Sequence, residues 1–155
     1  KNSDPRARLH FTDGIKWVAD AKPGSYDVII VDSTDPVGPA AGLFSETFYK
    51  NCHRALRPHG IVVGQSESPL FHPDLIVAMH KAMRAAGFAD TATLQFHQVT
   101  YPSGWWSCTM ACKDAALDGF REQAAAGRDF ATRYYNAAMH RAARALPEFL
   151  VQALR

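Results

Sequence analysis

The sequence comprises 155 residues, of which 47% are apolar and 21% are charged, and its formal net charge is +2. These values are typical of one globular domain with a sizeable core, and they argue against a wholly disordered chain. The charge is small and scattered, which disfavours nucleic acid as a partner. The sequence shows neither a membrane-spanning apolar run nor a secretory leader, and its three cysteines suit a reducing compartment, so we expect a cytoplasmic protein.

The first third of the chain predicts a strand, a helix and a second strand. Residues 8–12 alternate weakly between polar and apolar side chains, and the turn at Asp13 leads into a short helix that residues 23–25 end. Residues 28–31 form a continuous β-branched run, which is typical of a strand buried on both faces of a parallel sheet. This second strand ends at Asp32.

The middle of the chain continues the alternation of strand and helix. After a loop rich in proline and glycine, apolar residues recur at helical spacing over 48–56 until residues 58–60 stop them. Another short apolar strand is predicted at 61–64. Pro73 suits the first position of the next helix, whose apolar stripe is closed by Gly87.

The last part of the chain departs from this alternation. Residues 94–97 and 106–112 alternate strictly on either side of a turn at 102–104, which predicts an antiparallel hairpin with Trp106 in the core. The remainder, from about Ala115, is rich in alanine and is predicted to be helical. Together these elements predict an α/β fold with a mostly parallel sheet, helices on both faces and a C-terminal antiparallel hairpin.

Polar residues at strand ends are the first candidates for a functional site, because open α/β sheets bind ligands at the carboxyl ends of their strands. Asp32 and Asp35 directly follow a predicted strand, and the loop from Pro36 to Gly42 suits a lid over a ligand. The alternative is structural, since aspartates in such turns commonly accept hydrogen bonds from backbone amides. Position alone therefore predicts a carboxylate site without defining its chemistry.

Two other strand ends also carry polar residues. Asp13 and Gly14 are compatible with a simple turn, but a carboxylate beside a glycine can also accept a hydrogen bond from an adenine amino group. Gln65 needs a partner in the protein or in a ligand, and it and Glu67 are equally compatible with capping the next loop. Both strand ends therefore leave a binding role and a structural role open.

The hairpin turn adds an aromatic candidate. Tyr101 can form a hydrogen bond with an amine through its hydroxyl group and cover an aliphatic chain with its ring. Cys108 and Cys112 lie on one strand without a nearby pair of histidines, and the histidines show no His-x-x-x-His spacing. We therefore expect no metal site.

The segment from Tyr26 to Ala40, YDVIIVDSTDPVGPA, resembles the signature of spermidine synthases. These enzymes are aminopropyltransferases related in fold to the methyltransferases that depend on S-adenosylmethionine. Further matching segments occur at residues 42–44, 48–49, 65–67, 101–104, 134–136 and 140–143. The resemblance covers essentially the whole chain and implies a Rossmann-like sheet of the methyltransferase type.

The resemblance also implies roles for the candidate residues. Asp32 matches the family's proton acceptor, and Asp32 and Asp35 together match the carboxylates that hold the amine. The implied polyamine-binding residues are Asp32, Ser33, Thr34, Asp35, Gln65 and Tyr101. The implied nucleoside-binding residues are Asp13, Gly14 and Pro39.

The implied reaction transfers the aminopropyl group of decarboxylated S-adenosylmethionine to putrescine, giving spermidine and methylthioadenosine. The decarboxylated S-adenosylmethionine is then a co-substrate, and no cofactor is expected. The implied full-length enzyme is a homodimer or homotetramer without a nucleic-acid or membrane partner.

The sequence departs from the family at its beginning. Family members start with a small β-rich domain and a Gly-rich strand-to-helix turn, and neither stands before Lys1. We therefore expect residues 1–155 to be the C-terminal part of an aminopropyltransferase catalytic domain, with a sheet incomplete on its N-terminal side and no activity alone. Two alternatives stay open: a methyltransferase of the same fold, and a truncated chain that binds polyamine or nucleoside without catalysis. The two carboxylates favour a diamine over a neutral or anionic methyl acceptor.

Overall fold

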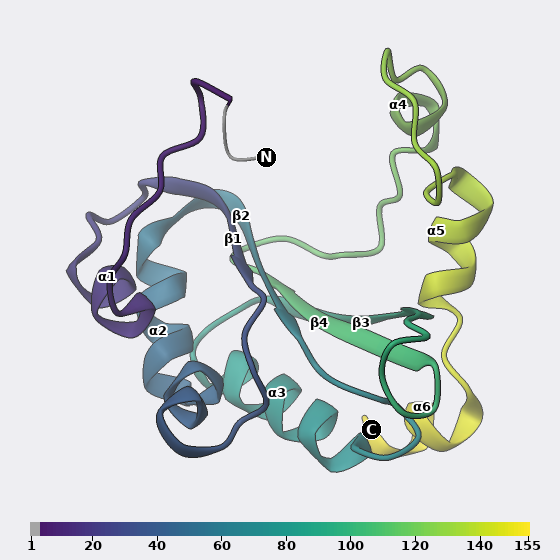
Figure 1. Cartoon of the computed structure of the whole chain (residues 1–155), viewed down its shortest axis with the longest axis horizontal. Coiled ribbons are helices and arrows are strands. Elements are labelled where there is room, and N and C mark those ends of the chain that lie inside the picture. Colours follow the sequence, from purple (N-terminus) through teal and green to yellow (C-terminus); the bar gives the residue numbers. More distant parts are fainter. Residues whose placement is uncertain (1–3) are drawn as a thin grey trace.

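The computed structural model describes residues 4–155, which form a four-stranded mixed sheet and the helices around it (Figure 1). The strands are β1 (Tyr26–Val31), β2 (Leu56–Gln65), β3 (Asp90–His97) and β4 (Trp105–Cys112). Their order across the sheet is β1-β2-β4-β3. β1 and β2 are parallel, whereas β4 is antiparallel to both β2 and β3. The predicted hairpin is therefore confirmed. Its second strand, β4, also pairs with β2 and so connects the hairpin to the parallel pair.

The helices surround this sheet unevenly. They are α1 (Gly14–Asp20), the 3-10 helix η1 (Gly38–Phe44), α2 (Glu46–Ala55), α3 (Pro73–Ala85), α4 (Glu122–Ala126), α5 (Ala137–Arg144) and α6 (Glu148–Ala153). In Figure 1, α2 and α3 lie along one face of the sheet, and α5 lies beside β3. The predicted helix at 48–56 and the one that starts at Pro73 are both confirmed, within a few residues at their ends.

Local sequence signals explain where the two main helices begin and end. Ser45 caps α2 by accepting a hydrogen bond from the amide of Phe48 at 3.1 Å, a contact typically worth about 1 kcal/mol. The same helix ends before Pro58, which would disrupt it. Pro73 occupies the first turn of α3, where its missing amide hydrogen costs nothing. These signals set the ends of the two helices that pack on the sheet.

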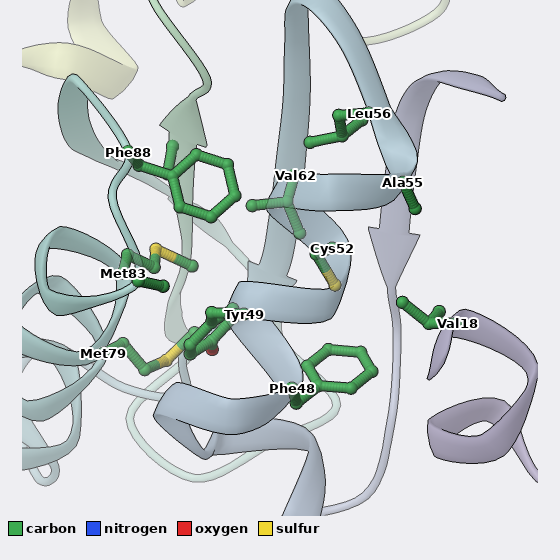
Figure 2. Packing of buried hydrophobic residues seen from close by; sticks show 12 residues of the cluster. Val18, Phe48, Tyr49, Cys52, Ala55, Leu56, Val62, Met79, Met83 and Phe88 are labelled. Atoms are coloured by element: carbon green, nitrogen blue, oxygen red, sulfur yellow. The ribbon is translucent and has the colours of Figure 1, made fainter. Parts of the chain in front are cut away.

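The core lies between these two helices and the sheet (Figure 2). Tyr49 and Cys52 of α2, Val62 of β2, and Met79 and Met83 of α3 are all at most 1% exposed. Complete burial of each large apolar side chain stabilises the fold by roughly 1.5–3 kcal/mol. The α3 stripe predicted from helical spacing therefore forms part of the core.

Two predictions about the first strands are wrong. Residues 8–12 form no strand, and Phe11 is 98% exposed, because the described part of the chain offers no neighbouring strand with which they could pair. β1 is a strand, but it is not buried on both faces: Val28 and Ile30 are 53% and 73% exposed. The opposite face of β1 packs on the core through Ile29 and Val31. β1 therefore presents an open apolar face.

Two predictions about the C-terminal half also need correction. Trp106 is only half-buried, and the fully buried face of β4 carries Ser107, Thr109 and Ala111. Alternation separates the two faces of a strand, but it does not say which of them meets the helices. The segment after residue 115 is not continuously helical, because Gly127 ends α4 and α5 starts only after the capping residue Asn136.

Candidate substrate-binding site

The acid loop, which we define as residues 32–37, leaves the carboxyl end of β1. Asp32 and Asp35 are exposed, and the hydroxyl group of Ser33 donates to the carbonyl of Thr34 at 3.0 Å. Among the described residues, no backbone amide donates to either carboxylate. The structural alternative for these aspartates therefore lacks the contacts on which it depends.

Asp32 and Ser33 line a groove of about 360 Å³ on the open face of β1. Gly14 and Trp17 of α1 line the same groove, so the structure brings the ends of two separate predicted elements together. Asp13 stands at the N-terminus of α1, where its Oδ1 atom accepts hydrogen bonds from the amides of Ile15 and Lys16 at 2.8 and 3.2 Å. Its Oδ2 atom accepts no hydrogen bond from the described residues.

The segment predicted as a lid lies against α1. A Cβ atom added to Gly42 would come within 2.6 Å of the Cδ1 atom of Ile15, so the two segments touch at this point. Gly38 has a φ angle of +58°, a conformation that favours glycine at the start of η1. Pro39 follows it and is exposed. The helical segment that carries Pro39 therefore contacts α1 at Ile15, the residue that follows the turn formed by Asp13 and Gly14.

The glutamate loop, which we define as residues 65–69, leaves the carboxyl end of β2. Glu67 is only 5% exposed, and its Oε2 atom lies 2.7 Å from Nδ1 of His72. The carboxyl group of Asp35, on the acid loop, lies close enough to the Glu67 carboxyl group to influence its pKa. Burial is the main cause that raises the pKa of Glu67, the neighbouring Asp35 raises it further, and His72 opposes both. Two carboxyl groups from neighbouring strand ends therefore share one small volume.

Gln65 and Tyr101 lie next to the glutamate loop. The Oε1 atom of Gln65 accepts a hydrogen bond from the amide of Glu67 at 3.1 Å, so this half-buried side chain supports the loop. Tyr101 is 50% exposed and stacks on Trp106 with ring centroids 4.7 Å apart. Its hairpin turn is attached to the glutamate loop by a 2.9 Å hydrogen bond between the hydroxyl groups of Ser68 and Ser103.

The candidate residues thus fall into two neighbouring groups. Asp32 and Ser33 share the groove with Gly14, whereas Asp35 lies near Glu67 and influences its pKa. The groove lining does not include Asp13, Asp35 or Tyr101, all of which the structure describes. The sequence left a binding role and a capping role open for Glu67, and Glu67 was not among the predicted site residues. The feature of the sequence that could have marked Glu67 as a site residue is its position just beyond a strand end, two residues after Gln65.

The described part of the chain shows neither a metal-binding cluster nor a membrane-spanning helix. Within residues 4–155, no cluster of three or more histidine, cysteine, aspartate or glutamate side chains has the arrangement of a metal site. No helix of that part of the chain has the length and apolarity needed to cross a membrane.

The mixed sheet, its terminal hairpin and the groove beside the end of β1 are those of a Rossmann-like fold of the methyltransferase type. Sequence comparison then gives the family. Residues 1–119 match the spermine/spermidine synthase domain, and the chain belongs to that family. A polyamine aminopropyltransferase from Methylococcus capsulatus is 64% identical over 154 residues, which are 99% of this chain and 54% of that protein.

Solved structures agree with this assignment. A spermidine synthase in complex with the transition state analogue AdoDATO superposes with a TM-score of 0.89 and 33% identity, covering 98% of this chain and 52% of that one. The spermidine synthase from Thermotoga maritima gives a TM-score of 0.86 at 33% identity, covering 98% and 51%. The chain thus spans about half the length of the relatives it matches.

Proposed function

We propose that this chain supplies the amine-binding part of a polyamine aminopropyltransferase, which transfers the aminopropyl group of decarboxylated S-adenosylmethionine to putrescine. The acid loop, which carries Asp32 and Asp35, leaves β1 beside the parallel strand β2 that leads to the buried carboxyl group of Glu67, and this juxtaposition is the observation that carries the proposal. Putrescine is a dication near neutral pH, and ammonium groups bind most strongly to carboxylates through charge-assisted hydrogen bonds. Neighbouring carboxylates on two strand ends suit such a ligand.

Asp32 is the proposed general base. An alkylammonium group has a pKa of roughly 10, so one amine must lose its proton before its lone pair can attack carbon. In the proposed step that proton passes to Asp32, a new C–N bond forms, and the C–S bond breaks with its electron pair left on sulfur. The sulfonium becomes the neutral thioether of methylthioadenosine, and no cofactor takes part.

Asp35 and Glu67 are proposed to hold the second ammonium group of the diamine. Two neighbouring carboxyl groups repel each other when both are ionised, which is one cause of the raised pKa of Glu67, and a cation between them removes that repulsion. The remaining proposed polyamine contacts are Ser33, Thr34, Gln65 and Tyr101. The exposed ring of Tyr101 suits the aliphatic part of the chain.

The proposed nucleoside contacts lie on the other side of the acid loop. Asp13 keeps its Oδ2 atom available for the adenine amino group, Gly14 lines the groove, and Pro39 would close the lid over the base. We also propose that the complete enzyme is a cytoplasmic homodimer or homotetramer, in line with the sparse cysteines and the family resemblance.

A chimera tests this function. Residues 1–155 would replace the matching 54% of the Methylococcus capsulatus relative, and methylthioadenosine and spermidine would be measured after addition of putrescine and decarboxylated S-adenosylmethionine. We expect both products from the chimera and neither from the 155-residue chain alone, which has no Gly-rich turn for the nucleoside. A folded chimera that binds the nucleoside but releases no methylthioadenosine, or that methylates an acceptor from S-adenosylmethionine, would contradict the proposal.

A further inference from the structure

A line of buried polar side chains crosses the sheet from α3 to the glutamate loop. Each of its members is at most 3% exposed: His80, Thr93, Thr109, Ser66 and Ser107. The line begins with His80 Nε2, which lies 2.8 Å from Thr93 Oγ1, and Thr93 Oγ1 lies 3.0 Å from Thr109 Oγ1. Thr109 Oγ1 lies 3.0 Å from Ser66 Oγ, which lies 2.8 Å from Ser107 Oγ. The line ends where Ser107 Oγ lies 2.8 Å from the carbonyl oxygen of Glu67. We refer to this series as the hydroxyl chain.

The last acceptor fixes the direction of the hydroxyl chain. The carbonyl of Glu67 can only accept, so the hydroxyl group of Ser107 must donate to it. Each hydroxyl group has one hydrogen, and Ser66 must therefore be the donor to Ser107. By the same reasoning Thr109 donates to Ser66, which leaves the oxygen of Thr109 as an acceptor.

The same count of one hydrogen per hydroxyl group also determines which ring nitrogen of His80 carries a hydrogen. Thr93 donates to Thr109, so it must accept from Nε2 of His80, and that nitrogen carries a hydrogen. Burial lowers the pKa of His80 to about 4, helped by Arg84 and opposed by Asp90, so the ring is neutral near pH 7. Its Nδ1 atom is then the acceptor for the hydroxyl group of Thr91 at 2.8 Å.

We infer that His80 is a positioning residue which acts through the hydroxyl chain on Glu67, and so on the binding of the diamine. The inference rests on the proposed function, because Glu67 matters to the reaction only as a ligand for the ammonium group. Its test therefore includes one measurement that needs no turnover.

The conformation of Glu67 explains why such a device is needed. Its φ angle is +58°, in the left-handed region that residues other than glycine rarely adopt. Ser107 holds its carbonyl and Gln65 holds its amide, so both polar backbone groups of the residue are fixed. In this conformation the side chain reaches His72. Because hydrogen bonds in a one-directional chain reinforce one another, a break at a distant link weakens the last one.

The tautomer of His80 is the first test. The chimera would be labelled with ¹⁵N at histidine, and long-range ¹H–¹⁵N spectra near pH 7 would be assigned by the signals that disappear in the His80→Gln variant. We expect a neutral ring with the hydrogen on Nε2. A hydrogen on Nδ1 would mean that Nε2 cannot donate to Thr93, as the hydroxyl chain requires. That result would overturn the inference, whether or not the chimera is active.

A matched pair of variants is the second test. Thr93→Val keeps the shape of the side chain but removes the hydroxyl link, whereas Thr93→Ser keeps the link. We expect Thr93→Val to raise the KM for putrescine about threefold to tenfold, with kcat and the KM for decarboxylated S-adenosylmethionine changed less than about twofold, and Thr93→Ser to stay near the unsubstituted chimera.

Equal putrescine KM values for the two Thr93 variants would overturn the inference, and so would a loss confined to kcat. If Thr93→Val does not fold, Ser107→Ala replaces it, since this change removes the donor to Glu67 itself. An unsubstituted chimera without methylthioadenosine release counts against the proposed function. That result is distinct, because the His80 spectrum reports on the chain without any reaction.

Discussion

The acid loop and the glutamate loop follow neighbouring parallel strands, yet the protein holds them in opposite ways. In the acid loop, Asp32 and Asp35 are exposed, and the few hydrogen bonds are local ones within residues 33–37. In the glutamate loop, Ser66, Glu67 and Ser68 are at most 5% exposed, and their side chains or backbone bond to β4 or to the hairpin turn.

This difference separates two ways of building a charged site. Loops with few buried contacts open at little free-energy cost, so the acid loop is suited to take its final shape around a ligand. The glutamate loop has its buried groups satisfied in advance, which fixes Glu67 before any ligand arrives. A diamine would then meet a prepared carboxylate on one side and an adjustable pair on the other.

The largest expected effect lies in the acid loop. Asp32→Asn keeps the shape of the side chain but removes the proton acceptor, so kcat of the chimera should fall about a hundredfold to ten-thousandfold. Binding of the nucleoside, measured by calorimetry, should barely change because Asp13 and Pro39 remain. If Asp32→Asn keeps the parent rate from about pH 7 to 9 while Asp35→Asn is inactive, the general base must be assigned to Asp35 instead.

The next effect is that of the buried His80 on the stability of the fold. The pKa of His80 is lowered to about 4 in the folded chain and is near 6.5 when unfolded, so between these values the folded state binds fewer protons. Stability is therefore lost as the pH falls through this window, by about 2 kcal/mol between pH 7 and pH 5 from this residue.

Urea unfolding of the 155-residue chain measures this contribution. His80→Gln removes the titrating ring, so the variant should lose about 2 kcal/mol less than the parent between the two pH values. His97→Gln, at an exposed position of β3, is the matched control and should follow the parent. Equal pH dependence in the parent and in His80→Gln would show that His80 is not held neutral by burial.

A smaller effect is expected for Asp35→Asn. The change removes one charge from the proposed ammonium site but leaves Asp32 and Glu67, so the KM for putrescine should rise about tenfold with kcat reduced much less. Steady-state kinetics with varied putrescine would measure it. An unchanged KM together with a large loss of kcat would place Asp35 in the chemical step and not in binding.

The smallest effect is expected for Gly42→Ala, which tests how the lid sits on α1. The added Cβ atom meets only the flexible end of Ile15, so the lid should shift slightly and raise the KM for decarboxylated S-adenosylmethionine by less than about fivefold. Gly119→Ala is the matched control, because nothing lies within 4 Å of its added Cβ atom. A rise in the KM for putrescine alone would mean that the lid covers the amine and not the nucleoside.

Local patterns in the sequence were sufficient for most of the elements. The stripe of α3, the hairpin and the position of Asp32 at the end of β1 were predicted correctly, because helical spacing, alternation and turn residues act over a few neighbouring positions. The segment from Tyr26 to Ala40 also predicted the family that the comparisons confirm. The roles of the individual site residues stay predictions.

Other features depended on distant parts of the chain. Residues 8–12 alternate like a strand, but the described residues 4–155 supply no strand with which they pair. The exposure of one face of β1 likewise depends on which segments pack on it, so the local pattern predicts neither feature. Glu67 looked like a loop residue, and its burial and its proximity to Asp35 appear only when the ends of β1 and β2 are placed side by side. The sequence alone thus determined most of the elements and the position of the acid loop. Tertiary structure decided which strand face is buried and which carboxylates meet, because both depend on contacts between residues far apart in the chain.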